Sequence, residues 1–191
     1  MVKIYWNGVA FHPTGIAKMH REILKELVKK DTKFHIFDNY NSELDEGKEL
    51  RDNAYYPIDV KDSDVATMMT YVPTTWPGDP KAVGRVYGLS IHEGDKLPED
   101  WSPIINNSIE RLFVISKANR NLFFNSGVRI PIHVIPGGID TKKFTPEGDK
   151  YPLPEEFKDK CVFLNVNSWT GEDGDRKGTD VLIKAFMEEF G

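Results

Sequence analysis

Hydrophobic positions in this chain gather in short runs, and the stretches between them are polar or carry apolar residues at helical spacing. The runs predict strands at residues 2–6, 33–38, 68–72, 85–91, 112–115 and 133–136, with a further short strand at 55–60. The intervening stretches predict helices from about residue 14 or 15 to 30, from residue 102, and over 117–126. Alternating strands and helices predict an α/β domain with a parallel sheet covered on both faces.

The predicted helices have recognisable faces and ends. Four apolar residues recur at helical spacing in the first helix and predict its buried face: Ile16, Met19, Ile23 and Leu27. Ser102 before Pro103 is typical of a capped helix start with proline in the first turn. Ser116 is predicted to cap the next helix, and Gly127 is predicted to end it.

A turn with two glycines ends this first series of strands and helices. The stretch HVIPGGIDTKKFTP at residues 133–146 reads as a strand that runs into Gly137 and Gly138, and the prolines that follow favour a linker. The pattern of strand and helix then restarts. We therefore predict a first domain at 1–150, and a linker with the first strand–helix unit of an incomplete second domain at 151–191.

The predicted second domain begins with the strand CVFLNV at 161–166, in which Cys161 is expected to be a small buried core residue. A helix follows from about Thr179, which is expected to cap it. Its apolar face is formed by Val181, Leu182, Ala185, Phe186 and Phe190. A single unit of this kind leaves an apolar sheet edge or helix face uncovered, so we expect that surface to be exposed and able to pack against another copy.

The bulk composition narrows the class of protein. Of the 191 residues, 39% are hydrophobic, which suffices for a sizeable core. The net charge of −5 argues against nucleic acid as the main partner. A single cysteine excludes a disulfide framework. No apolar run approaches the ~20 residues of a membrane span, and no secretory signal is visible, so we predict a cytoplasmic protein without a transmembrane segment.

The loop NGVAFHP and the helix that starts near Gly15 form a candidate anion site. Free backbone N–H groups and the helix dipole at such a start attract a phosphate or carboxylate, and Gly15 would let the ligand approach closely. The spacing from Gly8 to Gly15 fits neither GxGxxG nor a Walker A loop. From these residues alone, an ordinary strand–helix turn explains the segment equally well.

Two more stretches carry candidate chemistry. His92 and Glu93 follow the strand predicted at 85–91, and ligands of open parallel sheets bind beyond the carboxyl ends of strands. Arg176 and Lys177 precede the helix predicted from Thr179, where two cations and free N–H groups suit a diphosphate. A solvated loop is the alternative for the first pair, and a charged surface turn is the alternative for the second.

Paired acids occur twice, as Asp62-Ser63-Asp64 and Asp173-Gly174-Asp175. Each resembles a metal-binding DxD motif. For the first, acids that cap a short helix or a turn before Val65 are the better explanation, and the second is interpreted as a loop. We therefore predict no metal site.

Several of these strings resemble retaining nucleotide-sugar glycosyltransferases of family four, which have the two-domain GT-B fold. VIPGGIDTKKFTP is similar to the segment that closes their first domain, usually VIPNG(V/I)D followed by Phe, although Gly137 replaces the Asn. RLFVISKANRNLFFNSGV at 111–128 and RKGTDVLIKAF at 176–186 also resemble the family. The resemblance covers nearly the whole chain. It implies a Rossmann-like three-layer GT-B N-terminal domain, followed by the first unit of a second Rossmann-like domain.

The resemblance implies transfer of a sugar from a nucleotide-sugar to a sugar, glycan or lipid-linked acceptor, with retention at the anomeric carbon. His92 would lie beside the transferred sugar, and Glu93 would lie on the acceptor side. Gly15, Arg176 and Lys177 would bind the donor diphosphate. The nucleotide-sugar is a substrate, so no cofactor is implied. The family's Glu-x₇-Glu donor segment comes later in the second domain and is absent here, so the chain alone is expected to have little or no activity.

Two other classes remain open from the sequence. One is a non-catalytic half-protein that binds an acceptor or a nucleotide and works with a partner chain. The other is a Rossmann-like oxidoreductase domain, against which the missing GxGxxG counts.

Overall fold

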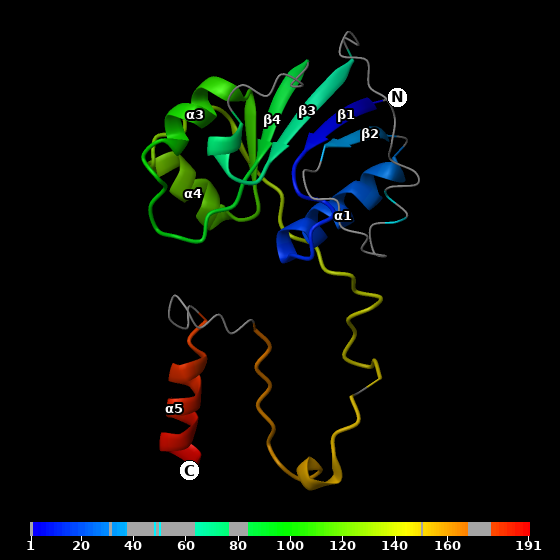
Figure 1. The fold of residues 1–191 in the computed structure, drawn as a ribbon, viewed down its shortest axis with the longest axis vertical. Helices are drawn as coiled ribbons and strands as arrows, with labels where there is room; N and C mark the ends of the chain where they lie inside the picture. Colours follow the sequence, from blue (N-terminus) through cyan, green and yellow to red (C-terminus); the bar gives the residue numbers. More distant parts are fainter. Residues whose placement is uncertain are drawn as a thin grey trace. The chain divides into compact units, whose positions relative to one another are not determined.

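The computed structural model describes residues 2–30, 32–37, 48, 50, 64–76, 84–149, 151–167 and 177–191 (Figure 1). The chain divides into two units, Met1–Ile139 and Asp140–Gly191, and each is described by itself below. The strand predicted at 55–60 lies outside the described residues. The structural division falls at the predicted glycine turn, while the domain assignment with its boundary at residue 150 stays a prediction.

The first unit is an α/β structure built on a parallel sheet. Its described strands are β1 (Val2–Asn7), β2 (Thr32–Phe37), β3 (Val65–Thr70), β4 (Arg85–Leu89), β5 (Arg111–Val114) and β6 (Ile132–Val134). All neighbouring strands pair in parallel, in the order β2-β1-β3-β4-β5-β6. The predicted parallel α/β fold is confirmed, and the arrangement is consistent with a Rossmann-like fold.

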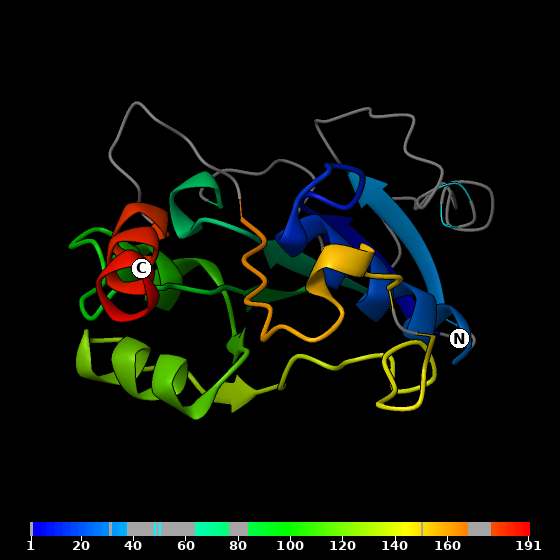
Figure 2. The same cartoon turned by 90° about the horizontal axis from the view of Figure 1, so that it is seen from below.

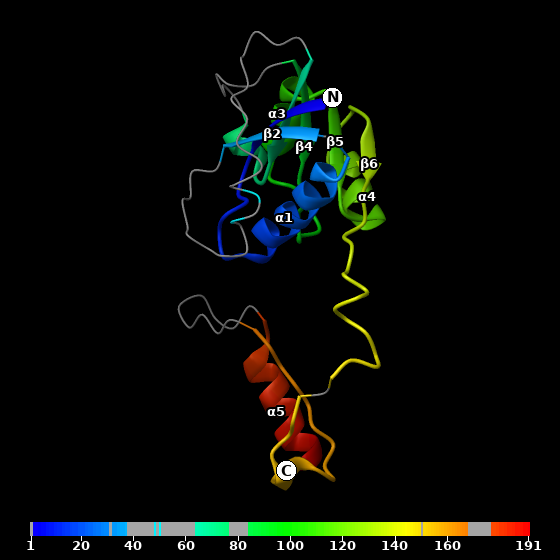
Figure 3. The same cartoon turned by 90° about the vertical axis from the view of Figure 1, so that its right-hand side faces the viewer.

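Helices cover both faces of this sheet, as Figures 1 and 3 show. Helix α1 (Gly15–Val28) lies on one face, and α3 (Trp101–Ser108) and α4 (Lys117–Asn125) lie on the other. Strand β5 illustrates why both faces are covered. Its successive side chains point to opposite faces of the sheet and enter two different apolar cores. Leu112 and Val114 are fully buried with Ile105 of α3 and Phe123 of α4, whereas Phe113 packs toward the core that contains Leu24 of α1.

The helix ends follow local capping chemistry. The Oγ1 of Thr14 accepts a hydrogen bond from the Ala17 N–H at 3.3 Å, and the Oγ of Ser116 accepts one from the Asn119 N–H at 3.0 Å, which confirms the predicted cap of α4. The predicted cap of α3 was wrong. That helix begins at Trp101 after Asp100, because the hydroxyl of Ser102 is buried and donates to the Ser126 carbonyl.

The buried face of α1 differs from the prediction. The residues that the fold buries are Ala17, His20, Arg21 and Leu24. The predicted stripe lies beside them: Met19, Ile23 and Leu27 are only partly buried, and Ile16 is 36% exposed. Two polar side chains, His20 and Arg21, thus lie on the buried face of the helix, and both contact the loop before it.

The second unit contains the short helical turn η3 (Glu155–Phe157) and helix α5 (Thr179–Phe190) among its described residues. The predicted strand at 161–166 is wrong, as the orange trace without an arrow shows in Figure 2. A strand needs a hydrogen-bonded neighbour, and the described part of this unit contains no other strand. For the same reason Cys161 is exposed rather than buried.

Helix α5 starts differently from the prediction and keeps an apolar surface. Gly178 takes the N-cap position with φ of +70°, while the Oγ1 of Thr179 accepts a hydrogen bond from Asn167 Nδ2 at 2.7 Å. Phe163 packs its ring against those of Phe186 and Phe190. The apolar residues that nevertheless remain exposed on this helix include Val181, Leu182, Ile183, Met187 and Phe190.

Candidate functional site

The strand order places a switch point between β1 and β3. The chain goes from β1 to β2 on one side and then crosses to β3 on the other side of β1. The connections therefore leave the carboxyl ends of β1 and β3 in opposite directions, which is where open parallel sheets bind ligands. The segments that follow β1, β3 and β4 at this edge are residues 8–14, 71–76 and 90–96.

The two strands at the switch point approach each other closely at Gly8. Its φ is +156°, and a Cβ added there would lie 1.5 Å from Oγ1 of Thr70. Thr70 Oγ1 itself donates to the Asn7 carbonyl at 3.1 Å, which ties the ends of β3 and β1 together. Only glycine fits this contact, so the position at which the loop leaves β1 is fixed.

Two buried side chains of α1 hold the loop after β1. His20 Nδ1 lies 2.7 Å from the Val9 carbonyl oxygen, and Arg21 donates to the Ala10 and His12 carbonyls at 2.8 and 3.1 Å. His20 is 1% exposed and Arg21 is 3% exposed. A buried guanidinium is tolerated only when such acceptors surround it, so this clamp is a specific feature of the fold. We call His20 and Arg21 the loop clamp.

Tyr71 carries backbone strain directly after β3. Its φ is +79°, and no other described residue except glycine has a positive φ. Such a conformation costs of order 1–3 kcal/mol and persists where the surroundings impose it. Ser90 Oγ donates to the Tyr71 carbonyl at 3.2 Å, and Trp76 Nε1 donates to the Thr70 carbonyl at 3.2 Å. These two hydrogen bonds therefore fix the carbonyls of both Thr70 and Tyr71 in the turn after β3.

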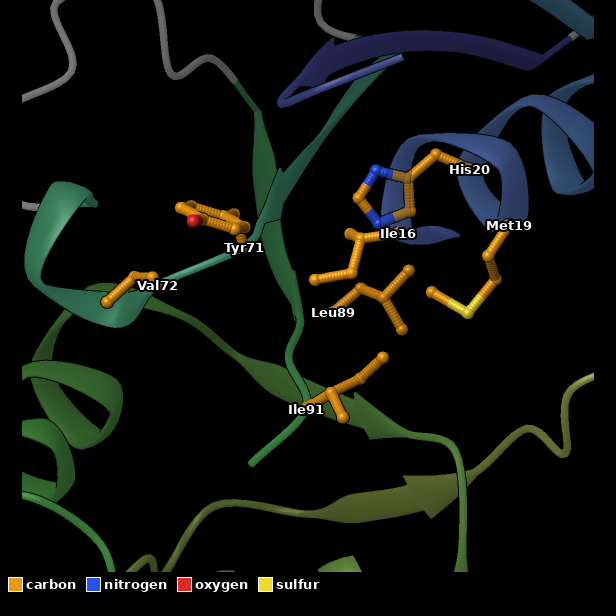
Figure 4. A pocket seen from close by; sticks show the side chains of 7 residues that line it. All are labelled: Ile16, Met19, His20, Tyr71, Val72, Leu89 and Ile91. Atoms are coloured by element: carbon orange, nitrogen blue, oxygen red, sulfur yellow. The ribbon is translucent and has the colours of Figure 1, made fainter. Parts of the chain in front are cut away.

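A small hollow lies between these elements. Its volume is about 50 Å³, and its lining comes from α1, the end of β3 and the β4 segment: Ile16, Met19, His20, Tyr71, Val72, Leu89 and Ile91. Figure 4 shows the His20 imidazole reaching toward the hollow from α1, with Tyr71 and Val72 on the β3 side. We call this feature the switch-point hollow. It is too small for a whole substrate, because ligand pockets commonly measure 300–1,000 Å³.

His92 is held firmly on the other side of the β4 segment. Asn119 of α4 donates from Nδ2 to the His92 carbonyl at 2.8 Å, and its Oδ1 lies 3.4 Å from the His92 backbone nitrogen, within reach of the N–H. The imidazole packs edge to face on Trp101 with 5.1 Å between ring centroids. Its Nε2 lies 3.0 Å from the Lys96 carbonyl. Since a carbonyl only accepts, Nε2 donates in this contact, which leaves Nδ1 as the acceptor nitrogen whenever the ring is neutral.

The other predicted site residues are exposed or lie outside the described residues. Gly15 is exposed at the start of α1, and a Cβ added there would meet no atom within 4 Å. Glu93 is exposed beside His92. Lys177 is exposed in the second unit, and Arg176 lies outside the described residues. The structure thus places Gly15, His92 and Glu93 in the first unit, and the predicted diphosphate site stays a prediction.

The sequence analysis missed His20, Arg21 and Tyr71. His20 and Arg21 lie between Ala17 and Leu24 on one helical stripe, and this spacing was the available signal. The positive φ of Tyr71 has no signature in the sequence, because glycine is the residue that usually marks such a position.

The described residues contain no group of three His, Cys, Asp or Glu side chains placed to hold a metal ion. Asp62, Ser63 and the acids at 173 and 175 lie outside the described part of the chain. In that same part, none of the helices has the length and apolar character needed to cross a membrane.

Comparison with models of known protein families gives no match, and comparison with curated proteins gives no significant match.

Proposed function

We propose that this chain takes part in the transfer of a sugar from a nucleotide-sugar donor to an acceptor, with its first unit on the acceptor side. The observation that carries the proposal is the placement of His92, which follows β4 at the carboxyl edge of a parallel sheet and is held on three sides. A side chain fixed in this way loses little freedom when it contacts a substrate.

The chemistry follows from the tautomer. With Nε2–H bound to the Lys96 carbonyl, the neutral ring offers Nδ1 as an acceptor for a sugar hydroxyl. Such a contact orients the donor sugar during departure of the nucleoside diphosphate. Glu93, exposed beside it, is assigned to the acceptor side.

The leaving diphosphate needs positive charge and N–H dipoles, which stabilise it without a metal ion. The resemblance assigns this role to the Gly15 N–H, Arg176 and Lys177. Free backbone N–H groups at the start of α1, where Thr14 caps only the Ala17 N–H, support the part of Gly15 in this assignment. Support for the two cations comes from the motif RKGTDVLIKAF alone.

A direct test is ligand titration followed by NMR of the histidine rings, since the chain has only five histidines. A panel of nucleotide-sugars that differ in base and sugar is added to the full chain. We expect one of them to shift the His92 ring resonances, and the matching nucleoside diphosphate without sugar to shift them less. His92→Ala should weaken binding at least tenfold. His133→Ala removes an exposed histidine of β6 and should leave binding unchanged.

Two results would overturn the proposal. One is a complete panel without any change at His92. The other is a His92→Ala variant that binds as tightly as the parent chain. If a nucleotide-sugar binds at His92 but no acceptor produces nucleoside diphosphate release, even with a second chain that completes the site, the chain is a binding protein rather than a transferase.

A further inference from the structure

A strained residue and a small hollow lie side by side at the switch point. Tyr71 holds a strained backbone, and the surrounding side chains leave about 50 Å³ unfilled beside it. Both features lie where the strand order reverses. Backbone strain beside a hollow, at the ligand-binding edge of a parallel sheet, indicates a binding subsite.

The lining indicates which chemical group the subsite takes. Five of its seven residues are aliphatic or thioether side chains: Ile16, Met19, Val72, Leu89 and Ile91. A phosphate or a polyhydroxylated ring would lose hydrogen bonds to water against these walls. A short alkyl group would gain contact with them. The two polar lining residues, His20 and Tyr71, come from different elements.

The volume limits the size of that group. An engineered cavity of about 150 Å³ binds benzene or xenon, and the present hollow has about one third of that volume. It therefore suits a methyl to isopropyl group better than an aromatic ring. Met19, which also lines the hollow, has an unbranched side chain that can adapt to the shape of such a group.

We propose that the switch-point hollow is a subsite for a short, branched alkyl group on the acceptor substrate. This assignment of the group to an acceptor rests on the function proposed above, whereas binding of an alkyl group in the hollow does not. The loop clamp supports the site, because His20 both lines the hollow and bonds the Val9 carbonyl. The neighbouring loop is thus positioned together with the subsite wall.

The test uses the full chain and methyl-detected NMR. Under a few bar of xenon, we expect the ε-methyl resonance of Met19 and the methyl resonances of Leu89 and Ile91 to shift. Isobutanol, which carries an isopropyl group, should shift the same resonances and compete with xenon. Glycerol, of similar size but with three hydroxyls, should not. Shifts with glycerol alone, or none with xenon and isobutanol, would overturn the proposal.

Matched variants localise the effect. Ile91→Phe should fill the hollow and abolish the xenon shifts of Met19 and Leu89. Ile139→Phe introduces the same side chain at a position that is 70% exposed and should preserve them. If Ile91→Phe does not fold, Val72→Phe replaces it. Unchanged xenon shifts in a folded filling variant would also overturn the proposal.

The outcome is separable from the glycosyl-transfer proposal. Xenon binding in the hollow without any response of His92 to nucleotide-sugars would leave the alkyl subsite standing and remove its assignment to a sugar acceptor. A response of His92 without xenon or isobutanol binding would remove the subsite and leave the glycosyl-transfer proposal standing.

Discussion

Asn119 brackets the backbone of His92, donating to its carbonyl at 2.8 Å while its own oxygen faces the His92 nitrogen at 3.4 Å. The side-chain amide thus replaces a neighbouring strand at the point where β4 has ended. Ser116 fixes Asn119 in turn, through the hydrogen bond from the Asn119 N–H. The position of His92 is therefore set by the first turn of α4, a helix far away in the sequence.

We predict that Asn119→Ala lowers the free energy of unfolding by about 2 kcal/mol, because it leaves two backbone groups of His92 without a partner. Urea denaturation measures the change. Asn121→Ala, at an exposed site on the same helix, should change stability by less than about 0.5 kcal/mol. Equal losses of stability in the two variants would contradict a specific role of the Asn119 hydrogen bonds to His92.

We predict opposite effects of alanine at two glycines. Gly8→Ala should destabilise the protein by about 3 kcal/mol, because its Cβ would overlap Thr70 and its φ disfavours a side chain. Gly15→Ala should be neutral or stabilise by up to about 1 kcal/mol, because it lies at a helix start with open space around it. Thermal unfolding of both variants checks the pair. A stable Gly8→Ala variant would show that β1 and β3 do not meet as described.

We predict that Tyr71→Gly stabilises the protein by about 1 kcal/mol. Glycine relieves a strain of order 1–3 kcal/mol and costs roughly 0.5–1 kcal/mol in chain entropy. Little burial is lost, because Tyr71 is 47% exposed. Tyr71→Phe keeps the strain and serves as the control, with unchanged stability in urea denaturation. A destabilised glycine variant would mean that the aromatic ring contributes more than the strain costs.

The glycine turn should respond to acid through Asp140. Its Oδ1 accepts from the Lys142 and Lys143 N–H groups at 2.9 and 3.1 Å, and these backbone hydrogen bonds lower the pKa of the carboxyl group. A lowered pKa in the folded state means that the carboxylate stabilises the turn above the ordinary pKa of aspartate. That contribution is lost as the pH falls through the lowered pKa.

We therefore expect the Lys142 and Lys143 amide resonances to move at a pH below that at which an ordinary aspartate titrates. An NMR titration of the full chain measures this. Asp140→Asn, which cannot titrate, should keep both resonances flat over the same range. Movement centred at the ordinary aspartate value would show that the two hydrogen bonds do not hold in solution.

Sequence patterns predicted the first unit well where local chemistry decides the structure. The apolar run at 112–115 became β5, and Ser116 caps α4 as expected. The strand predicted at 161–166 failed because pairing with a distant neighbour decides a strand, and apolar composition alone does not supply that neighbour. His20 and Arg21 were missed because a helical pattern treats polar residues as solvent-facing, whereas here loop carbonyls satisfy them.

The site shows the same limit. His92 could be placed from its position after a strand, but its bracket by Asn119 depends on how α4 packs. The switch-point hollow combines residues from three separated segments, so no pattern within a single segment predicts it.

The loop clamp has a consequence for the thermodynamics of binding. Because Arg21 and His20 already fix three carbonyls of the segment after β1, that segment loses little conformational entropy when a ligand arrives. Association at the switch point should then be governed by desolvation and direct contact, with a rate close to that of a rigid surface. Without the Arg21 guanidinium, the same loop would have to become ordered each time a ligand binds, and this ordering would weaken binding.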